Sequence, residues 1–230
     1  MNTDLTGGLL DKDIVELSHL YEELMPVWPT HPKFHKSVEE TIAGGDGSYN
    51  TLLHMGDHCG THVDAPAHFI AGGQTIETIS PRRLLGRGIK IDVSFLQPNQ
   101  EISLAMIKDW EARSVAIGAG DIVIFRTGYD QKWRNRPRHQ AFIADWPGLS
   151  GEGARYLIDK GVNAIGTDAM SLDAYTNSSY PSHQIVLGAG ALIIENLANL
   201  AILPDAFLFL ALPLRIKDGS ASPIRAVALV

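Results

Sequence analysis

The sequence predicts one mixed α/β domain in which strands outnumber helices. Short runs of β-branched and aromatic residues, each bounded by turn residues, recur along the whole chain, as is typical of strands. Two longer segments instead begin at a serine and carry apolar residues at helical spacing. No internal repeat, low-complexity tract or long Pro/Gly/Ser linker divides the 230 residues, so we expect a single domain over residues 1–230 with a sizeable core.

The expected elements follow one another in a definite order. The strand-like segments are 13–20, 51–56, 88–94, 121–128, 162–168, 191–197, 205–214 and 222–230. Ser103 is expected to cap a helix over residues 103–113, because a serine side chain can accept a hydrogen bond from a free amide of the first turn. Ser150 is expected to cap a second helix over residues 150–160, which Gly161 would end. Alternation of helix and strand in this half of the chain is typical of α/β proteins.

The composition disfavours nucleic acid and membranes as partners. Lys and Arg total 19 against 26 Asp and Glu, a formal net charge of -7 at pH 7 that repels a phosphate backbone. The longest apolar stretch, residues 197–214, is interrupted by Pro204 and Asp205, so it is not expected to span a membrane. The first residues lack the pattern of a secretory signal, and the one cysteine, Cys59, excludes an internal disulfide. We therefore expect a cytoplasmic protein.

One segment departs from the acidic composition. Residues 131–139, QKWRNRPRH, surround Trp133 with the basic side chains of Lys132, Arg134, Arg136 and Arg138. Most runs of like charge are solvated surface loops, and we interpret this segment as such a loop. Contact with an anionic partner is the alternative.

Histidines are concentrated between residues 54 and 69, where the chain reads HMGDHCGTHVDAPAHF. His58 and His62 are four residues apart and Asp64 follows, so two imidazole nitrogens and a carboxylate can converge on one cation. This donor set suits zinc or manganese better than copper(I) or an iron–sulfur cluster, which prefer thiolates. Gly60 and Pro66 disfavour a regular helix, so we expect an irregular segment held by its metal.

Three neighbours in this segment are less suited to metal binding. His54 falls in the strand-like segment 51–56 and is interpreted as an ordinary histidine with hydrogen-bond partners. Asp57 is interpreted as a turn residue or as a hydrogen-bond partner of a ligand. Cys59 is adjacent to a ligand position and is expected to point elsewhere.

The segment HCGTHVDAPAHF resembles the HxGTHxDxPxHF signature of the metal-dependent cyclase family, whose best-known members are bacterial kynurenine formamidases, with isatin hydrolases as ring-opening relatives. VWPT around Trp28, IGTDAMSLD at 165–173 and SHQIVLGAGALIIENL at 182–197 extend the resemblance over most of the chain. The resemblance implies a swivelling β/β/α fold and a homodimer or larger homo-oligomer.

The resemblance also implies a metal centre. His58, His62 and Asp64 would bind a first metal, and Asp64 would also reach a second. His183 would complete the second set of ligands, and Glu195 would bridge the two metals. The implied cofactors are two divalent ions per subunit, zinc or alternatively manganese.

The implied reaction is hydrolysis of an amide-type bond, such as the aryl formamide of N-formylkynurenine in tryptophan catabolism, by a metal-bound hydroxide. His68 would act as the general acid/base, and Trp28 would flank a small aromatic substrate. Phe34 and Phe69 are further candidates for an aromatic wall.

Three alternatives remain open. Ring opening of a cyclic amide or lactone is favoured by the long segment 129–150, whereas Glu195 favours the formamidases, because isatin hydrolases lack this second-metal carboxylate. An iron(II) oxygenase is suggested by the triad of His62, Asp64 and His183. The arginine usual in oxoglutarate-dependent members is absent shortly after the last histidine. A metal-binding protein without catalysis is the third alternative.

Overall fold

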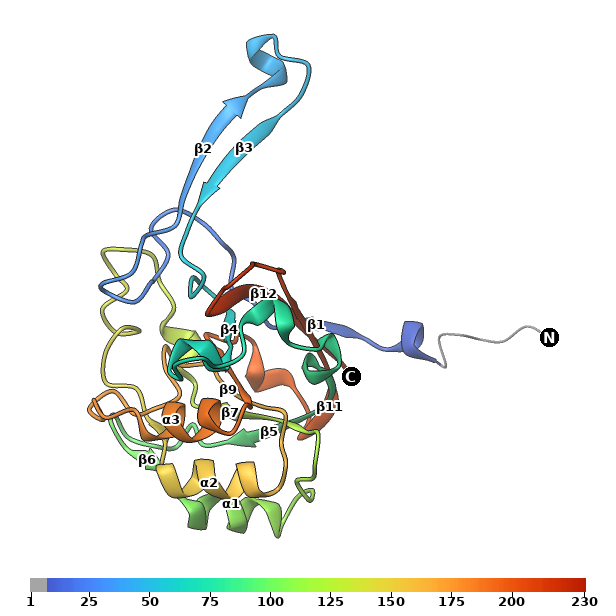
Figure 1. Ribbon diagram of the computed structural model, residues 1–230, viewed down its shortest axis with the longest axis vertical. Helices are drawn as coiled ribbons and strands as arrows, with labels where there is room; N and C mark the ends of the chain where they lie inside the picture. Colours follow the sequence, from blue (N-terminus) through green and yellow to red (C-terminus); the bar gives the residue numbers. More distant parts are fainter. Residues whose placement is uncertain (1–7) are drawn as a thin grey trace, which may run out of the picture.

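A mixed eight-stranded sheet lies at the centre of the molecule (Figure 1). The computed structural model describes residues 8–230; residues 1–7, part of the predicted domain and of the segment without a secretory pattern, lie outside the described residues. The strands β5, β7, β9 and β10 are parallel, and the remaining neighbours are antiparallel. The strand order is β1 (Ile14–Glu16), β12 (Ala221–Leu229), β11 (Ala206–Pro213), β5 (Leu85–Asp92), β7 (Ile122–Arg126), β9 (Ala164–Thr167), β10 (Leu192–Glu195) and β4 (His62–Asp64).

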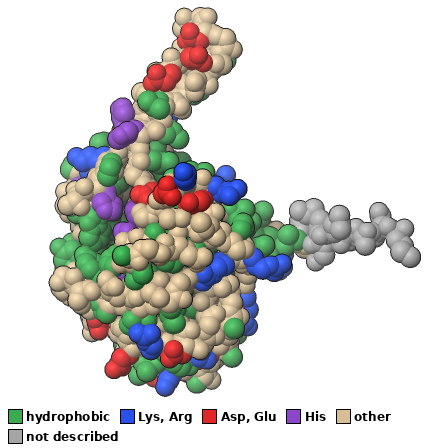
Figure 2. All heavy atoms as spheres, viewed as in Figure 1, with side chains coloured by type: hydrophobic (Ala, Val, Ile, Leu, Met, Phe, Trp, Pro, Cys, Tyr) green, Lys and Arg blue, Asp and Glu red, His purple; other side chains and the backbone are tan. Residues whose placement is uncertain are grey.

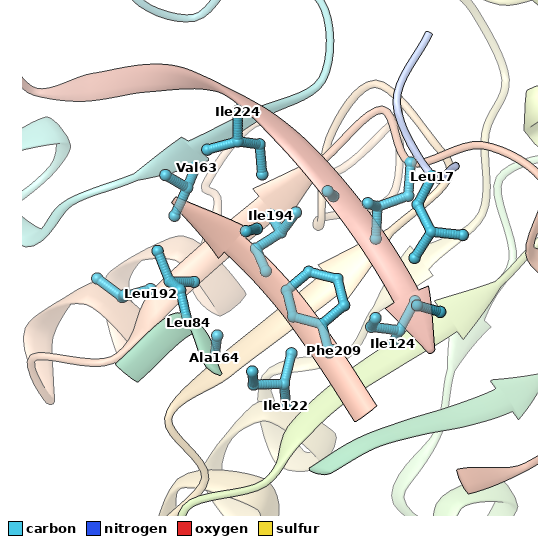
Figure 3. Packing of buried hydrophobic residues seen from close by; sticks show 14 of the residues in the cluster. Leu17, Val63, Leu84, Ile122, Ile124, Ala164, Leu192, Ile194, Phe209 and Ile224 are labelled. Carbon is cyan, nitrogen blue, oxygen red and sulfur yellow. The ribbon is translucent and has the colours of Figure 1, made fainter. Parts of the chain in front are cut away.

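A further pairing closes this sheet into a barrel. β4 pairs with β12 as well as with β10, so every strand of the sheet except β1 belongs to the closed ring. Side chains alternate across the barrel wall. On β7, Ile122 and Ile124 point into the barrel core, while Val123 belongs to a second apolar cluster outside it. Figure 3 shows the core side chains, with the ring of Phe209 among them.

Three helices cover the outer face of the parallel strands. The side chains of Ser103 and Ser150 cap α1 (Leu104–Glu111) and α2 (Gly151–Asp159), as predicted. α3 (Pro181–Gly188) packs on α2 and β10. No helix within residues 8–230 has the length and apolar character needed to cross a membrane.

Two smaller sheets flank the barrel. The antiparallel strands β2 (His35–Glu40) and β3 (Asn50–His54) form a hairpin, residues 35–54, that projects from the body in Figure 1 and is called the arm below. β6 (Glu101–Ile102) pairs in parallel with β8 (Gly148–Leu149). The 3-10 helices are η1 (Leu9–Asp11), η2 (Ile42–Gly44), η3 (Pro66–His68), η4 (Ile76–Thr78), η5 (Pro81–Leu84), η6 (Tyr129–Lys132) and η7 (Leu200–Ile202).

The predicted α/β class with a strand-rich core is confirmed, and each predicted strand and helix overlaps an observed one. The organisation of residues 1–230 as one domain stays a prediction. The main error concerns residues 62–64, which were expected in an irregular segment and instead form β4. This short strand exists because it pairs on both sides, with β10 and with β12, and such distant partners leave no local periodicity. α3 was not predicted either.

Candidate metal centre and active site

β4 supplies two residues of the site because side chains alternate along a strand. Val63 points into the barrel core, so His62 and Asp64 on either side of it point outward. The antiparallel register places His62 opposite Glu195 of β10, and opposed residues share one face of a sheet. His62 Nε2 lies 3.4 Å from Asp64 Oδ1 and 3.5 Å from Glu195 Oε2, and all three side chains are buried.

His58 approaches the same carboxylate from the turn before β4. Gly60 in this turn has φ +64°, and a Cβ atom there would lie 2.6 Å from the Tyr21 ring, so the turn requires glycine. His58 Nδ1 lies 2.8 Å from Asp64 Oδ1. His58 and His62 therefore converge on Asp64, as predicted, but His58 comes from a turn and His62 from a strand.

α3 brings His183 to the other side of the two carboxylates. Pro181 occupies the first turn of this helix, where a missing amide removes no helical hydrogen bond. His183 Nε2 lies 3.3 Å from Glu195 Oε1 and 3.8 Å from Asp64 Oδ2. Each carboxylate thus directs one oxygen toward His62 and the other toward His183.

The outer ring nitrogens of His62 and His183 are held by oxygen acceptors. His62 Nδ1 lies 2.8 Å from the carbonyl oxygen of Gly60, to which it can only donate. His183 Nδ1 lies 2.6 Å from Oδ2 of the buried Asp173. With the proton on Nδ1, a neutral ring presents the lone pair of Nε2 to the carboxylates, which is the orientation of a metal ligand.

His58 faces the carboxylate with its other ring nitrogen, Nδ1. Its Nε2 lies 3.0 Å from Ser220 Oγ, and the Ser220 hydroxyl donates to Asp57 Oδ2 at 2.8 Å. Because the hydroxyl proton is directed at Asp57, the serine oxygen accepts from Nε2, which leaves Nδ1 free toward Asp64. Asp57 therefore lies behind His58 as part of its hydrogen-bond support.

Two groups of donors have the spacing of a metal site. One group is His62, Asp64 and Glu195, and the other is His58, Asp64 and His68, with donor atoms within 4.8 Å of one another in each group. Both oxygens of Asp64 are buried, and neither accepts a hydrogen bond of normal geometry despite the nearby imidazoles. Buried oxygens that lack hydrogen-bond donors are suited to a cation, so these residues fit a divalent metal.

The charges of the centre are strongly coupled. Burial raises the pKa of Asp64, but His58 and His62 outweigh it and hold that pKa well below the usual value. Burial lowers the pKa of His62, but Asp64 and Glu195 outweigh it and raise the pKa to about 9. Burial also lowers the pKa of His183, but the hydrogen bond with Asp173, together with Glu195 and Asp64, outweighs it and raises the pKa to about 10. Protonated imidazoles thus balance the carboxylates in the metal-free protein, and a divalent cation would take over that role.

His68, at the end of η3, lies beside His58 at the same centre. The ring centroid of His68 lies 3.9 Å from that of His58 and 6.2 Å from that of His183. Burial lowers the pKa of His68 to about 4, against an opposing effect of Asp64. The imidazole is therefore neutral at pH 7, and a neutral imidazole can accept a proton or bind a metal.

A cavity of about 210 Å³ opens above this centre. This volume is below the roughly 300–1,000 Å³ of sites for drug-sized ligands and suits a molecule of one or two rings. Figure 2 shows histidine side chains among apolar ones below the base of the arm. Within residues 8–230, no lysine or arginine lines the cavity. Its lining residues are Trp28, His31, His58, His62, His68, Phe69, Met170, Ser171, Tyr180, His183, Glu195 and Asn196.

The aromatic candidates fall into two groups. Trp28 and Phe69 line the cavity, as predicted, and Trp28 packs edge to face on Trp146 with ring centroids 6.0 Å apart. Phe34 is only 5% exposed and lies in a core cluster with Met25, so its prediction as a wall residue was wrong. Aromatic side chains alone do not distinguish a pocket wall from a core.

Sequence reasoning also missed residues of the site. His31 lines the cavity three residues after Trp28, and its ring centroid lies 5.7 Å from that of His58. Tyr180 lines it from the residue before α3. The only available signal was that both residues lie close to segments that carry the family resemblance, VWPT and SHQIVLGAGALIIENL. In the same way Asp173, the partner of His183, is the last residue of IGTDAMSLD.

The remaining candidates lie outside the centre. His54 is exposed on the arm. Cys59 is buried, and burial raises the pKa of its thiol to about 11, so it remains protonated at neutral pH. Its position agrees with the expectation that it points away from the ligands.

A carboxylate and histidine centre on a barrel wall, facing a small pocket, is the arrangement of a metal-dependent enzyme. The chain belongs to the cyclase family, because the family model described as "Putative cyclase" matches residues 15–174. The resemblance inferred from HCGTHVDAPAHF is thereby confirmed.

Similar proteins carry two different names. An isatin hydrolase of Roseibium aggregatum is 34% identical over 218 residues, covering 86% of this chain and 81% of that protein. A kynurenine formamidase of Sphingopyxis alaskensis is 30% identical over 218 residues, covering 93% of this chain and 96% of that protein. The crystal structure of an isatin hydrolase bound to the product analogue thioisatinate superposes with a TM-score of 0.91 at 27% identity, covering 98% of this chain and 96% of the other.

Proposed function

We propose that the protein is a metal-dependent hydrolase that cleaves the amide carbon–nitrogen bond of a small aromatic substrate, with cyclic amides of the isatin type as the favoured class. The proposal rests on one observation: two buried carboxylates and three imidazoles meet at the floor of a small aromatic pocket. The similarity to an isatin hydrolase supports the same class.

We assign His58, His62, Asp64, His183 and Glu195 as ligands of two divalent cations, zinc or alternatively manganese. The opposed oxygens of each carboxylate support this assignment, because one set of atoms faces His62 and the other faces His183. A bound divalent cation polarises a carbonyl group and lowers the pKa of water, so that a nucleophile is available at neutral pH.

We assign His68 as the general acid/base. Its neutral imidazole, with a pKa of about 4, can take the proton of the attacking water and return it to the departing nitrogen. Its position beside His58 and at the cavity wall supports this role. General acid–base catalysis of this kind contributes a factor of about 10² to 10⁴ in rate.

The pocket wall favours a flat and uncharged substrate. Trp28 and Phe69 offer apolar ring surface, and an aromatic substrate packs well against such rings. Among residues 8–230, the lining holds no lysine or arginine to pair with a substrate carboxylate. An isatin-type ring is neutral, whereas N-formylkynurenine carries a charged amino-acid group.

An aryl formamide such as N-formylkynurenine is the second candidate, and Glu195 is the observation that favours it. This residue gives the centre a second carboxylate, which the family resemblance associates with formamidases. The similarity to a kynurenine formamidase along most of both chains supports this candidate as well.

The first prediction tests the reaction itself. We expect that removal of metal by a chelator abolishes turnover of isatin, that zinc or manganese restores it, and that kcat/KM for isatin exceeds that for N-formylkynurenine at least about tenfold. The measurement is steady-state kinetics with elemental analysis of the same samples. Full activity in metal-free protein would contradict the proposal, and the reverse substrate preference would establish the second candidate. Iron-dependent oxygen consumption would instead favour an oxygenase.

The second prediction concerns the shared carboxylate. Asp64→Asn should lose most of both cations, because both groups of donors use this side chain. His183→Ala should keep about one, because this imidazole faces only one side of the carboxylates. Metal content is measured by elemental analysis after gel filtration. Two cations in Asp64→Asn, or none in His183→Ala, would refute the assignment.

The third prediction separates the two possible roles of His68. His68→Ala should keep the metal content of the unaltered protein and lower kcat about 10²-fold to 10⁴-fold, because a proton shuttle acts in the transition state. His54→Ala, an exposed histidine on the arm, is the matched control and should change neither quantity. Loss of metal from His68→Ala would make this residue a ligand of the group that it forms with His58 and Asp64.

The fourth prediction concerns Trp28. Trp28→Ala should raise KM for an aromatic amide roughly fivefold or more, because about 1 kcal/mol of ring contact is lost, while metal content is unchanged. Trp28→Phe should restore most of the affinity. A lower melting temperature with unchanged KM would show that this half-buried ring serves the fold, since truncation of a core tryptophan costs about 3–5 kcal/mol.

A further inference from the structure

A tight turn presents two side chains of the cavity wall together. The backbone amide of His31 donates to the carbonyl oxygen of Trp28 at 2.9 Å, and Pro29, with its restricted φ, is the second residue of this turn. Pro32 then packs against Gly56, where a Cβ atom would lie 3.6 Å from the proline Cδ. The two prolines and this contact therefore hold Trp28 and His31 in a defined position relative to each other.

His31 lies between the aromatic wall and the metal centre. Its ring centroid is 6.4 Å from that of Trp28 and 5.7 Å from that of His58. Tyr180 lies beside His183, with ring centroids 5.9 Å apart. A flat substrate that packs on Trp28 and extends toward the centre therefore passes beside the imidazole of His31.

The imidazole of His31 is free to contact a molecule in the cavity. Within residues 8–230, its ring nitrogens form no hydrogen bond and no ion pair, unlike those of His58, His62 and His183. Among the described residues, neither group of donors with the spacing of a metal site includes His31. The side chain is half-buried and lines the cavity. In either protonation state an imidazole carries at least one N–H donor.

A cyclic amide of the isatin type needs such a donor. Its amide carbonyl, the group under attack, has a ketone as its direct neighbour, so the substrate is a 1,2-dicarbonyl compound. The ketone oxygen requires a hydrogen-bond donor of its own, because a polar group left unpaired in a pocket is unfavourable. The ketone is uncharged, so a single N–H of the cavity wall satisfies it.

We propose that His31 donates a hydrogen bond to the ketone oxygen adjacent to the scissile amide, and that this contact selects 1,2-dicarbonyl substrates over simple amides. The assignment rests on the proposed hydrolase function of the same site. Trp28 then holds the ring of the substrate, and His31, three residues later, recognises its second carbonyl group. The same hydrogen bond holds the ring-opened product, in which the ketone remains beside the new carboxylate.

The fifth prediction compares two ring-opened compounds with one skeleton. The hydrolysis product of isatin, 2-aminophenylglyoxylate, keeps the ketone, whereas 2-aminophenylacetate carries a methylene group in its place. In isothermal titration calorimetry of the metal-loaded protein, His31→Ala should weaken binding of the glyoxylate about fivefold or more and binding of the acetate less than about twofold. Only the glyoxylate loses a hydrogen bond. The value of kcat/KM for isatin should fall by a similar factor at unchanged metal content.

Two further variants at the same position separate the donor from the volume of the ring. His31→Phe keeps a ring without a donor and should behave like His31→Ala. His31→Gln keeps an N–H donor and should restore most of the preference for the glyoxylate. His35→Ala, which removes an exposed histidine outside the cavity, is the matched control and should change neither affinity. Circular dichroism verifies that the variants are folded.

The outcomes distinguish this contact from the reaction itself. Equal weakening of both compounds, or a preference for the glyoxylate that persists in His31→Ala and His31→Phe, would overturn the role of His31 and leave the hydrolase function intact. Absence of isatin turnover by the unaltered, metal-loaded protein would overturn the proposed function, and the role of His31 with it.

Discussion

The alternation of side chains along β4 is the constraint on which the site depends. Val63 belongs to the barrel core, and this fixes His62 and Asp64 on the outer face of the wall. A shift of one residue would turn the valine outward and bury the imidazole and the carboxylate in an apolar core. Because β4 pairs with both β10 and β12, the contacts that close the barrel also set this register. Barrel closure and site geometry therefore have a single cause.

The second constraint is electrostatic. Asp64 and Glu195 lie close together in a buried position, and buried carboxylates are unfavourable by several kcal/mol each unless positive charge offsets them. The pKa of Asp64 is lowered and that of His62 is raised, as expected when imidazoles supply that charge. The pairing of β4 with β10 in the barrel keeps the two carboxylates together despite their repulsion. A divalent cation satisfies the same demand with its own charge, which explains why this centre suits a metal better than a neutral ligand.

The sequence indicated what is local in the structure. Helix caps such as Ser103, the barrel strands other than β4, and the close spacing of His58, His62 and Asp64 depend on neighbours along the chain and were predictable. Glu195 joins the site through strand pairing, so only the family resemblance pointed to it. The support of His58 by Ser220, 162 residues away, was beyond any local pattern. The strand state of residues 62–64 was missed for the same reason.

The site divides into a floor built by the barrel and a wall built by loops. Most of the floor comes from β4, β10 and α3, whose packing leaves little freedom, and His58 joins it from the turn before β4. The wall includes Trp28 from the segment before the arm and Met170 from the segment after β9, and loop residues can change without disturbing a barrel. This division explains how one fold serves relatives named for different substrates. Trp133, in the basic segment 131–139, packs in the same cluster as Trp28 and Met170, so the pocket wall also depends on the position of this segment.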